Sequence, residues 1–153
     1  MKPRTKARSV ALQALYEIDI SGHRIGDVLE TRFSTPDVNL SPELQDFVSE
    51  IVRGVHPIRE VLDSHIAEHA PEWPIDQISV IDRNLLRIAL WEFAVQKATP
   101  LKVAINEAVE LAKMFGSDSS PRFVNGVLGS LAAQENQLRQ SLKNAIDKIP
   151  PKE

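Results

Sequence analysis

Four basic side chains stand at alternate positions at the start of the chain, without an acidic neighbour. They are Lys2, Arg4, Lys6 and Arg8, and the first eight residues contain no aspartate or glutamate. The rest of the chain carries 14 lysine and arginine residues against 21 aspartate and glutamate residues, a net charge of −7. A short basic arm on an acidic body favours a polyanionic partner that contacts the arm. A solvated, frayed terminus is the alternative interpretation.

A second candidate site is the pair Arg122 and Phe123, which follows Ser119-Ser120-Pro121, where a helix is expected to begin. At about 100° per residue, Phe123 lies at the edge of the apolar stripe of that helix rather than at its centre. Free backbone N–H groups in a first helical turn can meet an anion, and an exposed ring can stack on an unpaired base. The pattern favours nucleic-acid stacking, and the alternative is that Phe123 closes the core.

Signs of catalysis or cofactor binding are weak. The chain has no cysteine, which excludes disulfides and thiolate metal sites. It lacks the phosphate-binding loop, dinucleotide, serine-hydrolase and HExxH zinc motifs. His65 and His69 are spaced to share a helix face and a metal ion, but no third ligand is evident, and a polar flank of a surface helix is favoured. We therefore expect no catalysis, no cofactor and no metal.

Length and composition are those of a small globular protein. The 153 residues are 42% hydrophobic and 25% charged, which suits one compact domain or two small halves that share a core. No apolar run approaches the roughly 20 residues of a membrane span. No signal-type apolar core follows the basic start. These features predict a cytoplasmic protein with no membrane association.

The elements that must position the candidate residues are helices, because apolar residues recur at helical spacing almost everywhere. The expected all-α fold has helices over 7–18, Ile25–Phe33, 42–55 with breaks at Gly54 and Pro57, 58–66, Ile78–Gln96, 101–115 and 120–149. Gly126 and Gly129 fall inside the last of these, where each costs about 1 kcal/mol relative to alanine. Close approach of another helix backbone would explain them, and a bend is the alternative.

The stretch from Ala70 to Pro74 holds two prolines, which cannot sit inside a regular helix. It predicts an N-terminal helical bundle over 1–70 that carries the arm, a junction over 71–77 and a C-terminal bundle over 78–153, packed as one compact domain. Trp73 is expected to pack across this junction, since a large aromatic beside prolines is more often structural than an exposed binding residue.

Four stretches of sequence are more specific than a general helical pattern. They are ALQALY (11–16), DRNLLRIALWE (82–92), VAINEAVELAK (103–113) and FVNGVL (123–128). Their order and spacing resemble the NusB family of transcription antitermination factors, from about Arg4 to Leu131. The resemblance implies two packed helical bundles, a partnership with the ribosomal protein NusE, and binding of boxA-type single-stranded nascent RNA, notably in ribosomal RNA leaders. It also implies indirect action on the RNA polymerase elongation complex.

The resemblance also implies roles for particular residues. The basic arm matches the arginine-rich start of the family, which contacts RNA, although Thr5 lowers its density of cations. Tyr16 and Asp82 match positions near the RNA and NusE surface. Phe123 matches an RNA-facing aromatic, and Pro121 is unusual just before it.

Three alternatives remain open from the sequence. The same fold resembles the N-terminal domain of some ribosomal RNA cytosine methyltransferases, and the absence of a catalytic domain before Glu153 favours the stand-alone factor. A helical module that binds only protein is the second alternative. Some members of the family form homodimers that could hide the RNA surface, so a homodimer is also possible here.

Overall fold

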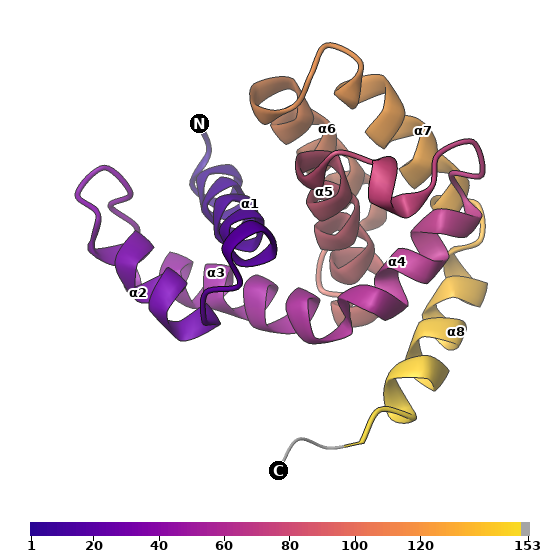
Figure 1. Ribbon diagram of the computed structural model, residues 1–153, viewed down its shortest axis with the longest axis horizontal. Helices are drawn as coiled ribbons and strands as arrows, with labels where there is room; N and C mark the ends of the chain where they lie inside the picture. The colour runs from indigo at the N-terminus through magenta and orange to yellow at the C-terminus, as the bar shows by residue number, and fades with distance from the viewer. Residues whose placement is uncertain (151–153) are drawn as a thin grey trace. The chain divides into compact units, whose positions relative to one another are not determined.

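The computed structural model describes residues 1–150, in which the regular elements are helices. No β-strand occurs in this range, which confirms the all-α prediction. Within it, no helix is both long enough and apolar enough to cross a membrane. The elements are α1 (Pro3–Ser21), α2 (Ile25–Ser34), α3 (Pro42–Val55), the 3₁₀ turn η1 (His56–Ile58), α4 (Arg59–Glu68), the 3₁₀ turn η2 (Ile75–Gln77), α5 (Val80–Leu90), the π-helix η3 (Trp91–Gln96), α6 (Leu101–Phe115), α7 (Ser120–Ala132) and α8 (Glu135–Asp147) (Figure 1).

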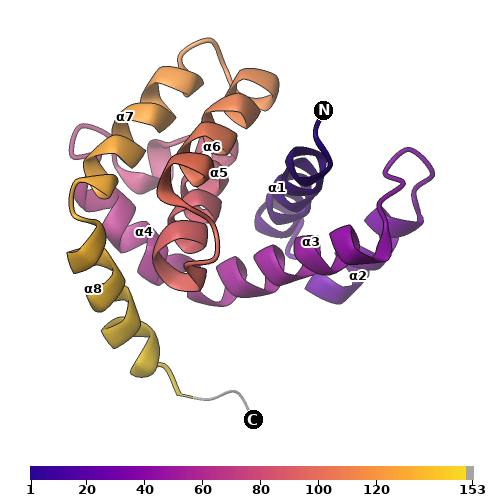
Figure 2. The same cartoon turned by 180° about the vertical axis from the view of Figure 1, so that it is seen from behind.

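The chain forms two compact units, Met1–Pro57 and Ile58–Glu153. In the first unit α1 packs against both α2 and α3, which also contact each other (Figure 2). The helices of this unit end and begin at residue types that commonly stop or cap a helix. Gly22 ends α1 in the left-handed conformation at φ 72°, with its N–H donating to the Ile18 carbonyl at 2.9 Å. Ser41 caps α3 by accepting the Leu44 N–H at 3.3 Å.

The structure divides the chain earlier than the sequence interpretation, which used bundles over 1–70 and 78–153 joined by 71–77. The helical backbone is interrupted after Glu68, as the two prolines require. However, α4 packs against α5 and α8, so this interruption lies inside the second unit. The division falls after Pro57, inside the 3₁₀ turn η1 that follows α3.

Helix α5 lies at the centre of the second unit, packed against α4, α6 and α7 (Figure 1). The expected helix over Ile78–Gln96 differs from the structure at both ends. It begins only at Val80, after Ser79 as the N-cap. From Trp91 the backbone widens into the π-helix, which ends at Lys97 with φ 64°. Apolar residues cover most of the circumference of this element, and most of it is buried.

Two expectations for the C-terminal part were wrong. The apolar stripe predicted one helical region over 120–149, whereas α7 ends at Ala132 and α8 begins at Glu135. A Cβ atom built at Gly126 or Gly129 would meet nothing within 4 Å in the described part of the molecule, so no other helix backbone approaches them there. These two glycines are exposed positions on α7.

Candidate nucleic-acid interface

The basic arm is the first part of α1 in the first unit, not a tail that precedes the helix. The helix begins at Pro3, its N-cap Lys2 makes no side-chain capping bond, and its first turn contains no acid. Lys2 and Arg4 are exposed, and Lys6 is partly exposed. The positive end of the helix dipole adds to these charges instead of offsetting them. This helix start therefore carries an uncompensated positive field suited to phosphate.

Arg4 and Arg8 share one aromatic neighbour, Phe47 on α3. The guanidinium carbon of Arg4 lies 4.7 Å from the centroid of the Phe47 ring, and that of Arg8 lies 5.2 Å from it. Arg8 is only 2% exposed, whereas Arg4 is exposed. The predicted arm therefore contains two kinds of cation. Arg8 is buried in the first unit, whereas Arg4 is exposed and lies against the Phe47 ring.

The sequence pattern did not single out Phe47, and this contact was missed. The signal that could have found it is the spacing of Arg4 and Arg8, because residues four apart lie on one helix face. Such a pair favours a single partner on the neighbouring helix.

The second unit contains a groove of about 410 Å³ at the start of two helices. Ser79 and Asp82 come from the start of α5, and Ser119 precedes α7. The groove brings together four residues that the sequence singled out, namely Trp73, Asp82 and the pair Arg122 and Phe123. Its lining residues are Trp73, Gln77, Ile78, Ser79, Asp82, Ser119, Arg122 and Phe123.

Phe123 is partly exposed, and the neighbouring Val124 and Leu128 are fully buried. This agrees with its predicted place at the edge of the apolar stripe. Trp73 is 52% exposed and lines the same groove, so the expectation that it packs away at a junction was wrong. The weaker alternative, an exposed binding residue, fits the structure. The neighbouring prolines restrict the local backbone but do not determine which residues surround the Trp73 ring. The sequence therefore could not distinguish a packed tryptophan from an exposed one.

Asp82 lines the groove although it is only 8% exposed. Its backbone N–H donates to the Ser79 hydroxyl at 3.1 Å, which fixes it in the first turn of α5. The side-chain oxygen Oδ1 is buried and has no hydrogen-bond partner in the structure. An unsatisfied buried acceptor is costly, and the helix dipole offsets only part of that cost. Because Oδ1 has almost no accessible surface, a donor that enters the groove could meet only the second carboxylate oxygen of Asp82.

A tight turn fixes the position of α7 and hence of Arg122 and Phe123. Gly116 caps α6 in an extended conformation, and a Cβ atom there would collide with the side chain of Ser120. The Ser120 hydroxyl, buried in this turn, accepts the N–H of Ser117 at 2.9 Å. The glycine allows this close approach. Arg122 and Phe123 come two and three residues after Ser120, so the turn also fixes where they lie.

Arg122 is exposed, and no hydrogen bond or ion pair involves its side chain among residues 1–150. Tyr16, the remaining predicted site residue, lies on α1 in the first unit and is 41% exposed. Both side chains are thus presented for contact.

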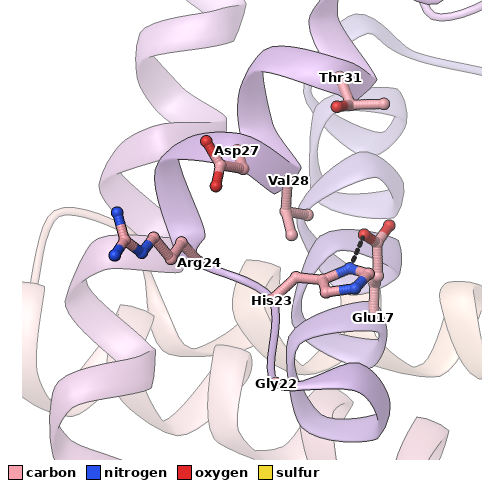
Figure 3. A pocket seen from close by; sticks show the side chains of 7 residues that line it. All are labelled: Glu17, Gly22, His23, Arg24, Asp27, Val28 and Thr31. Atoms are coloured by element: carbon pink, nitrogen blue, oxygen red, sulfur yellow. Dashed lines mark hydrogen bonds and ion pairs between the residues drawn. The ribbon is translucent and has the colours of Figure 1, made fainter.

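A polar pocket of about 430 Å³ lies beside the loop between α1 and α2 (Figure 3). His23 and Glu17 lie beside each other in its lining and interact directly, with the His23 Nδ1 and a Glu17 carboxylate oxygen 3.2 Å apart. Arg24 and Asp27 complete a surface on which opposite charges alternate. Such a mixed surface has no net preference for an anion, so we do not include it in the interface.

The two histidines considered as metal ligands connect helices of the second unit. The Nε2 atom of His65 lies 3.0 Å from the Ser141 hydroxyl on α8, and the Nδ1 atom of His69 lies 2.7 Å from the Ser130 hydroxyl on α7. No group of three or more histidine, aspartate or glutamate residues is placed to hold a metal ion within the described range. The contacts observed at both histidines are structural.

These features define an all-helical binding module with a cationic helix start in one unit and an aromatic, acid-lined groove in the other. The chain belongs to the NusB family, whose model matches residues 5–133. It is 46% identical over 130 residues to a transcription antitermination protein NusB of Dehalococcoides mccartyi, an alignment that covers 84% of this chain and 89% of the relative.

Two solved structures share the fold. NusB of T. maritima matches with a TM-score of 0.77 at 26% identity, covering 92% of this chain and 99% of that one. A chain from a crystal structure of the antitermination factors NusB and NusE in complex with dsRNA matches with a TM-score of 0.74 at 23% identity, covering 92% and 98%. The sequence-based assignment to the family is confirmed.

Proposed function

We propose that this chain is a transcription antitermination factor that binds boxA-type nascent RNA together with NusE and supports antitermination by RNA polymerase, notably in ribosomal RNA transcription. The observation that carries the proposal is the 46% identity, over most of both chains, to a protein named for this activity. The complex of related fold with NusE and dsRNA supports the choice of partners. The chain acts in the cytoplasm as an adaptor, without catalysis.

The arm and the groove supply the RNA contacts in this proposal. Lys2, Arg4 and Lys6 bind phosphate, because they are the accessible cations of the helix start. Phe123 stacks on an unpaired base while Arg122 holds a neighbouring phosphate. Neither role requires a sequence-specific contact, so together they position single-stranded RNA.

Tyr16 in the first unit and Asp82 in the second unit each contact RNA or NusE in this proposal. Tyr16 offers an exposed ring with a polar end, a type of side chain favoured at protein interfaces. Arg8 acts indirectly in the same proposal: its buried guanidinium keeps Phe47 in place beneath Arg4.

A salt-dependent gel-shift assay tests the proposal against a module that binds only protein. With boxA RNA, a shift that weakens steeply with added salt is expected, because released counterions drive the binding. A scrambled RNA of equal length should bind more weakly, and added NusE should sharpen the difference. Absence of any RNA shift, combined with retained NusE binding, would assign the chain to protein binding alone.

Sedimentation analysis of the free chain and of its RNA complex decides between a monomer and the homodimer that the sequence leaves open. A dimer that dissociates when RNA binds would mean that self-association covers the RNA surface. A monomer under both conditions would remove this form of regulation.

A further inference from the structure

Arg4 is an exposed cation of the arm that already has a partner within the first unit. Its guanidinium carbon lies 4.7 Å from the centroid of the Phe47 ring on α3. No hydrogen bond or ion pair involves its side chain among residues 1–150. A free arginine side chain samples many rotamers, and it loses that freedom when it binds a phosphate. A ring that orders Arg4 in the free protein removes part of this cost before RNA binds.

The chemical nature of this partner decides what Arg4 can still do. A carboxylate in the place of the ring would hold the guanidinium by charged hydrogen bonds, but it would also cancel its charge. An aromatic face attracts a cation through its quadrupole and carries no net charge. Arg4 therefore keeps its positive charge, and its N–H donors stay available for the oxygens of a phosphate.

The position of the Phe47 ring does not depend on Arg4. Phe47 is partly exposed, but its neighbour Val48 is fully buried where α3 packs against α1. On the same ring, the guanidinium carbon of Arg8 lies 5.2 Å from the centroid, and Arg8 is 2% exposed. The ring thus contacts one buried cation and one exposed cation. Losing the exposed one leaves the ring fixed by α3 and Arg8.

We propose that Phe47 is a positioning residue for RNA binding, whose ring orders Arg4 for a phosphate and makes no contact with RNA itself. This inference rests on the proposed RNA-binding function and adds to the arm a residue from a different helix. Lys2 and Lys6 have no such ring contact within residues 1–150 and supply charge alone. The aromatic ring at position 47 therefore contributes to RNA affinity only through Arg4.

Fluorescence anisotropy of labelled boxA RNA tests the role of the ring. Phe47→Leu keeps an apolar side chain but removes the aromatic face, and it should weaken RNA binding by roughly threefold to fivefold, the size of one exposed cation–π contact. Phe47→Tyr keeps the face and should bind RNA as the wild type does. An affinity that is unchanged in Phe47→Leu, with boxA RNA bound by the wild type, overturns the inference and leaves the proposed function intact.

Phe33→Leu is the matched control. Phe33 is a partly exposed phenylalanine of α2 in the same unit, and no cation lies over its ring within residues 1–150. The same substitution there should leave RNA affinity unchanged. Equal losses in Phe33→Leu and Phe47→Leu would mean that any disturbance of this unit weakens binding, and they would overturn the specific role of Phe47.

A double-mutant cycle separates positioning from every other effect of the ring. In an Arg4→Ala background, Phe47→Leu should cause no further loss of RNA affinity, whereas in a Lys6→Ala background its effect should persist in full. All variants are compared at a temperature at which circular dichroism shows them folded, so that a lower Tm does not enter the result. A loss that adds to that of Arg4→Ala would overturn the inference, because the ring would then act independently of Arg4.

The salt dependence of binding provides a second readout that altered folding alone does not explain. Phe47→Leu should leave the slope of log K against log salt unchanged, since Arg4 still reaches its phosphate in the complex. Arg4→Ala should lower that slope by roughly 0.7, the contribution of one phosphate contact to single-stranded RNA. A slope lowered equally in both variants would overturn ordering before binding. If the wild type binds no RNA at any salt concentration, the proposed function itself fails.

Discussion

Arg87 and Asp63 form a two-point ion pair that joins α5 to α4. The Nε atom of Arg87 donates to Oδ1 of Asp63 at 2.7 Å, and its Nη2 atom donates to Oδ2 at 2.6 Å. The side chain of Arg87 is 6% exposed and that of Asp63 is 18% exposed. This pair helps to anchor α4 in the second unit, where α4 also packs against α5 and α8.

Removing Asp63 should therefore destabilise the protein strongly. Asp63→Ala leaves the buried guanidinium of Arg87 without its carboxylate, and we expect a loss of about 3 kcal/mol in the free energy of unfolding, measured by urea denaturation. Glu135→Ala is the control, because it breaks a more exposed pair with Arg139 and should cost less than about 1 kcal/mol. Equal losses in the two variants would contradict the anchoring role.

The accessible arm should determine how RNA binding depends on salt. Replacing Lys2, Arg4 and Lys6 with alanine should weaken RNA binding and lower the slope of log K against log salt by about 2, at roughly 0.7 per phosphate contact. Helix content should stay constant or rise, since three cations leave the positive end of α1. The control replaces the exposed Lys102, Lys143 and Lys148. If this control lowers the slope equally, the effect is one of net charge and the arm has no special role.

Arg8 should behave differently from its neighbour Arg4. We expect Arg8→Ala to cost about 1–2 kcal/mol of stability, because it removes a buried cation from the Phe47 ring. Arg4→Ala should cost less stability and more RNA affinity, since Arg4 is exposed. Thermal melting and gel shifts on both variants separate the two roles. A stable Arg8→Ala variant with RNA binding as weak as that of Arg4→Ala would make Arg8 a direct RNA contact.

Phe123 should matter for RNA more than for stability. Phe123→Ala should leave Tm within a few degrees of the wild type and lower RNA affinity about tenfold, or roughly 1.4 kcal/mol, within the range of one stacked base. Leu128→Ala, on the same helix and fully buried, should instead cost about 2–5 kcal/mol of stability. A large drop in Tm for Phe123→Ala, with RNA binding intact at low temperature, would assign the ring to the core.

The helices could largely be predicted from the sequence, because their signals are local. Gly22 and Pro42 fix helix ends through backbone geometry, and Ser41 does so through its capping hydroxyl. The apolar spacing shows which faces are buried. The division of the chain into units could not be predicted in the same way. It depends on which helices α4 contacts, and the ion pair of Asp63 with Arg87 joins residues that no local pattern connects.

The candidate site, like the fold, could be predicted only where the sequence signal is local. Phe123 could be placed at a stripe edge from periodicity, and its partial exposure agrees with that position. Trp73 could not be assigned, because whether a ring beside prolines is covered depends on distant elements. That Asp82 shares a groove with Phe123 required the packing of α5 against α7, and its unpartnered oxygen is visible only in three dimensions.

Joint recognition of RNA by the chain and NusE is the claim on which the proposed function depends. The most direct measurement is the Kd of labelled boxA RNA for this chain, determined with and without saturating NusE and repeated with scrambled RNA. We expect NusE to tighten boxA binding by at least about tenfold, a coupling of roughly 1.4 kcal/mol, and to tighten scrambled RNA far less. Equal affinities for boxA and scrambled RNA, unchanged by NusE, would contradict the proposed function.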